Sequence, residues 1–346
     1  MQNLQPGLPS LPKLGGIKRR VVNTRPTDMV QIGPLDEARK LPLLAQPNLP
    51  GVDLHDWLES HREEVLKVLH ENGGILFRGF ECPLAGFSAA LSPNRLDYNE
   101  RSSPRKSVGD KIYTSTEHPA SEPIFFHNEN SYQKYFPKHI AFACETPAAS
   151  GGQTPIADTR RVLERISAAV REKFRTKNVM YVRNFAPGLG LRWQDVFNSE
   201  DQAEVEKYCQ AADIECEWYG ADKLRTRHVR PSELKHPETG DWSWFNHAAF
   251  FHVTTLPERT QKMLLTLVPE GELPTNTYYG DGEPIEADVV EHIREAYKQE
   301  TVRFDWRRGD ILLLDNLIVA HARDPFDGAR RILVSMMDAI GRDAAV

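Results

Sequence analysis

The sequence is poor in cysteine and contains no long apolar run. Its four cysteines are scattered over 346 residues and form no C-x-x-C pair, which argues against a zinc ribbon and against a disulfide-stapled scaffold. No apolar stretch approaches the roughly 20 residues that a membrane-spanning helix needs. The first residues also lack the apolar segment of a secretory signal peptide. We therefore expect a cytoplasmic protein with reduced cysteines and no membrane partner.

Neither sign of charge is in large excess, because the formal net charge is only -6. Nucleic-acid binding usually needs a basic footprint, so the composition speaks against a nucleic-acid partner. The chain shows no internal repeat, and its 40% hydrophobic and 27% charged residues are typical of a globular protein. We expect a loosely ordered arm over residues 1–48, rich in Pro, Gly and basic residues, followed by a single domain over residues 49–346.

Hydrophobic periodicity predicts many short strands with helical insertions. One helix is expected over residues 54–71, where Leu54, Trp57, Val65 and Val68 recur at helical steps. From residue 178 onward the pattern is mostly that of strands. This arrangement predicts a mainly β fold with helical insertions, a double-stranded β-helix or jelly roll, in which a metal can sit between two sheets. Strands are expected at residues 75–77, 139–144, 154–157, 179–184, 214–218, 224–230, 242–246, 301–306, 311–315, 318–321 and 330–337.

A histidine and a carboxylate stand two residues apart at His127 and Glu129. Side chains at this spacing point to the same side of a strand, so both can reach one metal ion. They would supply two ligands of a 2-His-1-carboxylate facial triad, the centre typical of non-haem Fe(II) oxygenases. An H-x-E triplet also occurs by chance, so ordinary polar residues near a strand end are the alternative interpretation.

Two residues far downstream strengthen the metal interpretation. His321 closes the apolar run of residues 311–320, and Arg331 follows ten residues later on the next expected strand. An arginine on a strand beside a metal ligand suits a bidentate clamp on a carboxylate. 2-Oxoglutarate has this requirement, because its distal carboxylate needs a fixed cation while its other end chelates iron.

These motifs together resemble the taurine catabolism dioxygenase superfamily of Fe(II)/2-oxoglutarate oxygenases. Residues 74–80, 113–117 and 126–132 are similar to a narrower branch, the syringomycin-cluster hydroxylase-like proteins, which tend to act in natural-product pathways. The matching stretches run from about residue 74 to residue 337. The motifs that carry the resemblance are His127-x-Glu129, Gly151-Gly152-x-Thr154, Asp315-Asn316, His321 and Arg330-Arg331.

The resemblance implies a jelly roll of the clavaminate synthase-like type with a catalytic iron. Its metal ligands would be His127, Glu129 and His321, and the oxidant would be O2. 2-Oxoglutarate would be held by Arg331, with Thr154 as a hydrogen-bond partner.

Two positions narrow the implied chemistry. Ser335 stands where the taurine enzyme carries a sulfonate-binding arginine, so a sulfonate substrate is not expected. Glu129 fills the place that halogenating relatives leave to a small residue, so oxygenation is expected rather than halogenation. We therefore expect an Fe(II)/2-oxoglutarate-dependent dioxygenase that hydroxylates an unactivated C–H of a small amino-acid-like molecule.

Several alternatives remain open at this point. The substrate is either free or tethered to a carrier protein, and desaturation or cyclisation would use the same centre. A jelly-roll metal-binding protein that does not use 2-oxoglutarate is a further alternative, and the sequence leaves homo-oligomer formation open. His247 could compete as a metal ligand, and Arg105 could either meet a substrate acid or phosphopantetheine or form a buried structural ion pair. The candidate substrate-binding residues are Thr116, Asn128, Asn130, Tyr132, Asn246 and Arg323.

Overall fold

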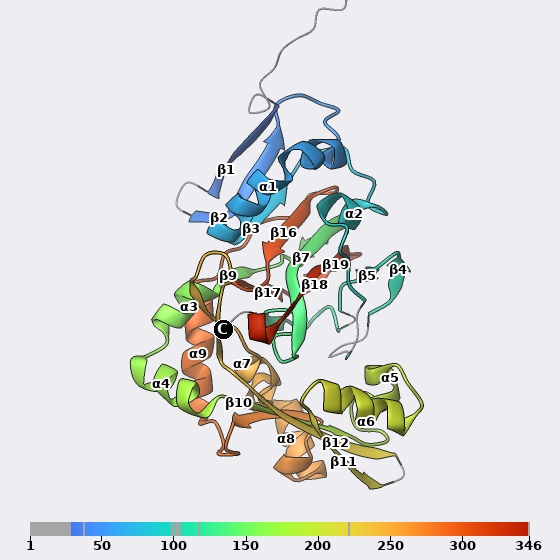
Figure 1. Cartoon of the computed structure of the whole chain (residues 1–346), viewed down its shortest axis with the longest axis vertical. Coiled ribbons are helices and arrows are strands. Elements are labelled where there is room, and N and C mark those ends of the chain that lie inside the picture. Colours follow the sequence, from blue (N-terminus) through green and yellow to red (C-terminus); the bar gives the residue numbers. More distant parts are fainter. Residues whose placement is uncertain are drawn as a thin grey trace, which may run out of the picture.

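Two β-sheets form the frame of the protein, which the computed structural model describes over residues 29–36, 39–97, 100, 105–116, 118–220 and 222–344. The strands of the larger sheet are β1 (Val30–Asp36), β2 (Arg39–Pro47), β3 (Gly74–Phe77), β4 (Ser107–Gly109), β5 (Ile112–Thr114), β7 (Tyr135–Thr146), β16 (Ile311–Asp315) and β19 (Arg331–Gly341). The strands of the smaller sheet are β6 (Ile124–His127), β9 (Ile156–Asp158) and β17 (Val319–Arg323). The larger sheet has the order β1-β2-β3-β16-β7-β19-β5-β4 (Figure 1). The smaller sheet has the order β6-β17-β9.

Strand β16 is buried on both of its faces, which explains its unbroken apolar run. Leu312 and Leu314 pack with Ile156 of β9 and Val319 of β17, in the core that joins the two sheets. Leu313 belongs instead to a core on the other face of the larger sheet, which includes side chains of the first helix. Because side chains alternate along a strand, one short strand serves two cores.

That first helix, α1 (Leu54–Asn72), covers the outer face of the larger sheet. It begins where the Asp53 side chain accepts hydrogen bonds from the backbone N–H groups of His55 and Asp56. It ends at Gly73, whose left-handed φ of 89° lets the chain turn directly into β3. The expected helix over residues 54–71 is therefore confirmed.

A long insertion between β9 and β16 supplies most of the helices and forms the lower part of the view in Figure 1. It contains a four-stranded sheet with the order β11-β12-β10-β15. No helix in the described part of the chain is both long and apolar enough to cross a membrane. The insertion consists of α3 (Thr159–Arg165), α4 (Ala168–Lys177), β10 (Val179–Phe185), α5 (Trp193–Phe197), α6 (Gln202–Ala211), β11 (Glu215–Gly220), β12 (Lys223–Arg230), β13 (Glu233–Lys235), β14 (Trp242–Trp244), α7 (Ala248–Phe251), η2 (Val253–Thr255), α8 (Glu258–Leu267), η3 (Glu270–Glu272), β15 (Thr275–Tyr279) and α9 (Ala287–Gln299). The remaining short elements are α2 (Phe87–Leu91), β8 (Ser150–Gly151), β18 (Phe326–Asp327) and η4 (Arg342–Ala344).

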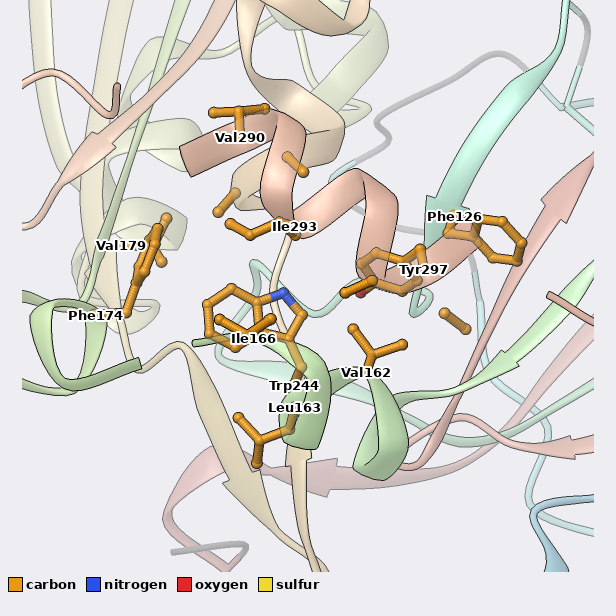
Figure 2. Packing of buried hydrophobic residues seen from close by; sticks show 14 of the residues in the cluster. Phe126, Val162, Leu163, Ile166, Phe174, Val179, Trp244, Val290, Ile293 and Tyr297 are labelled. Atoms are coloured by element: carbon orange, nitrogen blue, oxygen red, sulfur yellow. The ribbon is translucent and has the colours of Figure 1, made fainter. Parts of the chain in front are cut away.

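A cluster of buried side chains joins this insertion to the smaller sheet (Figure 2). The ring of Tyr297 from α9 stacks on Phe126 of β6, with centroids 5.5 Å apart and planes 12° apart. Val162 of α3 and Trp244 of β14 belong to the same cluster. Since Phe126 directly precedes His127, this packing holds the strand that ends at the first expected metal ligand.

The expected fold is confirmed, because the protein is mainly β with helical insertions arranged as a jelly roll. The boundary of the expected N-terminal arm needs correction. Strands β1 and β2 belong to the larger sheet, and β2 pairs in parallel with β3 through Leu43 and Ile75. Prolines lie on both sides of the apolar Leu43, at positions 42 and 47. Because proline argues against a strand, the sequence pattern did not indicate β2. The remaining arm, residues 1–28, lies outside the described residues.

Replacing Gly73 by alanine should destabilise the fold. The new Cβ would lie 2.5 Å from Val319 Cγ2, and the φ of 89° is unfavourable for a residue with a side chain. We expect G73A to lower the free energy of unfolding by about 2–4 kcal/mol in urea denaturation. The control is G33A in β1, where nothing lies within 4 Å of an added Cβ. A G73A protein as stable as G33A would contradict this account of the turn.

Candidate active site

Three donor side chains meet where the smaller sheet brings two distant segments together. His127 at the end of β6 is the direct antiparallel partner of His321 on β17. Glu129 lies two residues beyond the end of β6, and its Oε2 is 3.7 Å from His321 Nε2. All three residues are buried, and their donor atoms lie within 4.8 Å of one another. The structure thus brings together the three metal ligands that the sequence predicted.

The approach of Glu129 depends on a turn and not on a continuous strand. The Asn316 side chain accepts a hydrogen bond from the Glu129 N–H (2.7 Å) and donates to the carbonyls of Glu129 (3.0 Å) and Pro137 (2.8 Å). Asn128 Nδ2 donates to the Asn316 carbonyl at 2.8 Å. The chain then turns through Asn130, which has a left-handed φ of 57°. The sequence predicted that strand alternation would place the Glu129 carboxylate beside His127. In the structure, Asn316 holds the backbone of Glu129 in a turn instead.

Both histidines present a lone pair suited to a metal. His127 Nδ1 lies 2.9 Å from the Phe125 carbonyl, which only accepts, so Nδ1 carries the proton and Nε2 is left for a metal. Burial lowers the pKa of His127, and it lowers the pKa of His321 well below its ordinary value. Both rings are neutral at pH 7, the form that binds metals. Two neutral imidazoles and one carboxylate fit a ferrous ion in a facial triad.

Arg105 forms an ion pair with the third donor. Its Nη2 donates to Glu129 Oε1 at 3.1 Å and to Oε2 at 2.8 Å, and the two side chains are 4% and 3% exposed. The structure thus decides between the two roles left open for Arg105 in favour of a buried carboxylate. The Arg105 guanidinium offsets the negative charge of the buried Glu129 carboxylate, as a bound divalent ion would also do.

A pocket beside His127 and His321 contains a second cation, the half-buried Arg330. Arg330 Nε donates to the Gly152 carbonyl at 2.9 Å, and its Nη2 lies 3.4 Å from Thr154 Oγ1. Burial lowers the pKa of Arg330 to about 10, so the group stays charged at neutral pH. Among the described residues no carboxylate forms an ion pair with it, which leaves the guanidinium available to an anionic ligand.

The structure corrects the position expected for Arg331. Its side chain is 51% exposed, and its Nε donates to Glu145 Oε2 at 2.8 Å, outside the pocket. Ile332 and Val334 line the pocket, and strand alternation puts Arg330 on their side. The sequence contains two adjacent arginines, and only the direction of β19 shows which one faces inward.

Two of the six candidate substrate-binding residues line the pocket, Thr116 and Arg323. The Arg323 guanidinium already donates to the carbonyls of His118 (3.0 Å), Pro119 (2.6 Å) and Glu122 (2.8 Å). Its observed contacts are therefore those of a residue that holds a loop at the edge of the pocket.

The other four candidates lie away from the pocket. The Tyr132 hydroxyl donates to the Glu100 carbonyl at 2.8 Å, and Asn246 Nδ2 donates to the Ser232 carbonyl at 2.7 Å. Asn128 is engaged with Asn316, and Asn130 faces a separate pocket. Proximity in sequence to His127 and Glu129 was a poor guide, because the chain turns away directly after Glu129.

His247, the competing metal ligand, lies close to the site but has another partner. Its Nδ1 is 2.6 Å from Ser131 Oγ, and its ring centroid is 5.8 Å from that of His127. Phe250 covers the His127 ring at 4.6 Å. Sequence reasoning missed Phe142, whose ring lies 4.9 Å from that of His321, because it resembles any other apolar strand residue.

The fold and the site together define a class, that of jelly-roll proteins with a 2-His-1-carboxylate centre beside a cationic pocket. Over residues 35–337 the chain matches the taurine catabolism dioxygenase TauD, TfdA family, and it belongs to that family of Fe(II)/2-oxoglutarate-dependent dioxygenases. The family, the enzyme class and the cofactors Fe(II), 2-oxoglutarate and O2 that the motifs predicted are confirmed.

Comparison with individual proteins gives relatives in several organisms. The dapdiamide synthesis protein DdaC of Enterobacter agglomerans is 39% identical over 278 residues, which cover 79% of this chain and 84% of that protein. A clavaminate synthase-like protein of Arabidopsis thaliana is 28% identical over 293 residues, covering 81% and 86%. The crystal structure of PvcB from Pseudomonas aeruginosa shares the fold, with a TM-score of 0.54 at 16% identity over 96% of this chain and 97% of that one.

Removing the Asn316 side chain should weaken iron binding. N316A leaves the Glu129 N–H and two buried carbonyls without their partner, so we expect at least a tenfold loss of Fe(II) affinity and about 2–4 kcal/mol of stability. Anaerobic Fe(II) titration with 2-oxoglutarate, followed by its visible charge-transfer band, measures the first effect, and urea denaturation measures the second.

The matched control is N184A, in the insertion. Asn184 also makes three side-chain hydrogen bonds, to the carbonyls of Gly271 and Leu273 and to Arg225. It should lose a similar amount of stability and keep the iron affinity of the wild type. Equal affinities in N316A and N184A would show that Asn316 does not position Glu129.

Proposed function

We propose that His127, Glu129 and His321 hold the ferrous ion and that Arg330 holds the distal carboxylate of 2-oxoglutarate. The observation that carries this proposal is the pocket that joins both histidines to a half-buried arginine without a carboxylate partner among the described residues. Thr154 is the second contact for the co-substrate, as expected from its sequence motif. Its hydroxyl lies 3.4 Å from Arg330 Nη2 and accepts a hydrogen bond from Trp306 Nε1 at 3.0 Å.

The proposed reaction is hydroxylation of an unactivated C–H. The iron supplies dioxygen activation coupled to decarboxylation of 2-oxoglutarate, and the protein supplies position and a closed environment. Glu129 occupies the third ligand position with a carboxylate, which supports oxygenation over halide transfer. Phe142 and Phe250 flank the two histidines and keep water from the side of the site that they cover.

The proposed substrate is an amino acid or an amino-acid-derived intermediate, either free or tethered to a carrier protein. The relative DdaC supports this class, because its name places it in the synthesis of dapdiamide. Ser115 and Thr116 line the pocket and offer hydroxyl groups to a polar substrate. We also place the enzyme in the cytoplasm, which agrees with its four free cysteines.

Substituting the two adjacent arginines should separate their roles. R330A removes the cation of the pocket, so we expect KM for 2-oxoglutarate to rise by about 100-fold, the scale of losing a bidentate carboxylate contact of about 2–3 kcal/mol. R331A removes an exposed ion pair with Glu145 and should change KM less than twofold. Steady-state assays of succinate formation measure both constants. A large effect confined to R331A would overturn the assignment.

A pooled screen tests the substrate class. Incubating the Fe(II)-loaded enzyme with 2-oxoglutarate, air and pooled amino acids should give succinate and a product heavier by one oxygen, detected by mass spectrometry. A second pool holds the same acids as thioesters on a carrier protein, and H127A is the inactive control. A product lighter by two hydrogens would show that the reaction is desaturation or ring closure and not hydroxylation. Substrate-dependent succinate from neither pool would exclude the proposed substrate class.

A further inference from the structure

A second group of metal-binding side chains lies where the last turn of α1 meets β7 and the end of β16. His139 and Asp315 are direct partners across these antiparallel strands, so their side chains emerge on the same face of the sheet. His70 approaches from α1, with Nε2 3.1 Å from His139 Nε2 and 4.0 Å from Asp315 Oδ2. The three donor atoms lie within 4.8 Å of one another. None of these residues belongs to the active site.

The group contains a buried carboxylate that needs a cation. Asp315 is 0% exposed, and the ion pairs that the structure shows for it within 4.0 Å are with His70 and His236 alone, not with a described lysine or arginine. Its Oδ1 accepts a hydrogen bond from the Leu317 N–H at 3.0 Å. A buried carboxylate without a lysine or arginine partner is unfavourable, and a divalent ion beside it would offset that cost.

The proton position of His139 directs its Nε2 lone pair at His70, whose Nε2 donates a hydrogen bond to it at 3.1 Å. His70 would bind a metal through Nε2 with its own proton on Nδ1. His139 Nδ1 lies 2.8 Å from Asp338 Oδ2, which only accepts, so Nδ1 carries the proton and the Nε2 lone pair faces the group. This carboxylate–histidine contact is the outer partner that metal-binding histidines usually have. Burial lowers the pKa of His70 to about 4, so that ring is neutral at pH 7.

His236 orients the carboxylate and is not a ligand itself. Its Nδ1 accepts hydrogen bonds from the backbone N–H groups of Glu238 (3.2 Å) and Thr239 (3.1 Å). The proton is therefore on Nε2, which donates to Asp315 Oδ2 at 2.9 Å. The carboxylate is thus held in place by one imidazole while two others face it with their Nε2 atoms.

We propose that His70, His139 and Asp315 form a structural zinc site, separate from the iron centre. Two imidazole nitrogens, one carboxylate oxygen and a water molecule make up a tetrahedral set that zinc accepts. The His70 side chain is 12% exposed and gives the ion a path of entry, whereas His139 and Asp315 are almost fully covered. A covered site that lies apart from the catalytic pocket is suited to holding structure rather than to binding substrate.

The zinc would fasten α1 to the end of β16. Asp315 directly precedes Asn316, the residue that holds the backbone of Glu129. The site would thereby stiffen the segment from which the iron ligand is positioned. His70 acts in this respect as a positioning residue, because it touches neither iron nor substrate.

A variant without the iron site isolates the zinc site. In H127A/H321A, purified without a histidine tag and passed over a desalting column after loading, we expect about one equivalent of zinc by elemental analysis. Co(II) in its place should give visible d–d bands of tetrahedral type. Adding H70Q, a change on the rim of the group, should abolish the retained zinc and the bands. Adding H55Q on the same helix, where His55 is exposed, should leave both intact.

Stability gives a second readout that does not depend on stoichiometry. Zinc should raise the Tm of H127A/H321A and of its H55Q derivative but not that of the H70Q derivative, because a ligand that binds only the folded state stabilises it. Circular dichroism shows whether H70Q is folded. Absence of retained metal and of a Tm rise in folded H127A/H321A would overturn the site, as would equal retention with H70Q. Neither result would affect the assignment of the iron ligands.

Discussion

The side chain of Asn316 is the contact on which the active site most depends. Its amide pairs with both the N–H and the carbonyl of Glu129, and so it fixes a turn that leaves the sheet. The pairing of β6 with β17 brings His127 and His321 together, but it cannot place a carboxylate beyond the end of the strand. Asn316 supplies that position from the segment between β16 and β17. The three donor side chains that the sequence predicted as iron ligands therefore come from two segments that a single buried amide holds in register.

Buried charge is the second constraint on this interior. Glu129 pairs with Arg105, and Arg78 pairs with Asp310, whose Oδ1 it approaches at 2.9 Å. Arg330 differs from these residues, because the described structure offers it a carbonyl and a hydroxyl but no carboxylate. A guanidinium that is largely withdrawn from water and has only neutral partners is unfavourable unless an anion binds to it. The same reasoning that explains the ion pairs thus favours Arg330 as the partner proposed for an anionic co-substrate.

The sequence predicted the parts of the fold that follow from local pattern. Helix α1 has helical periodicity and a left-handed glycine at its end, and β16 is an apolar run of strand length. The meeting of three donor side chains at the candidate metal centre was predictable, because the His127-x-Glu129 spacing, His321 and a nearby arginine are all chemical signals. Strand β2 was missed because its prolines are typical of loops, although they lie near an edge of the sheet where a missing N–H is tolerated.

The direction in which individual side chains point could not be predicted from the local sequence pattern. Arg330 and Arg331 are adjacent, and the choice between them depends on the face of β19, which the pairing with β7 determines. A β-bulge at Glu145 lies in that pairing, next to Arg331. Asn128, Asn130 and Tyr132 looked like pocket residues because they flank Glu129, but a turn held by Asn316 directs them elsewhere. Such outcomes depend on contacts almost 190 residues apart in the chain.

Adjacent residues at the end of β16 show how the two faces of one sheet are linked. Asp315 faces the group formed by His70 and His139, while Asn316 reaches the turn that carries Glu129. Because the two residues share one backbone segment, tightening either contact restricts the other. Helix α1 is linked in this way to Glu129, because His70 lies 4.0 Å from Asp315 and the next residue, Asn316, pairs with the Glu129 backbone. The outer layer of the jelly roll is therefore joined to the candidate metal centre by adjacent residues of one segment, although α1 supplies none of its three donor side chains.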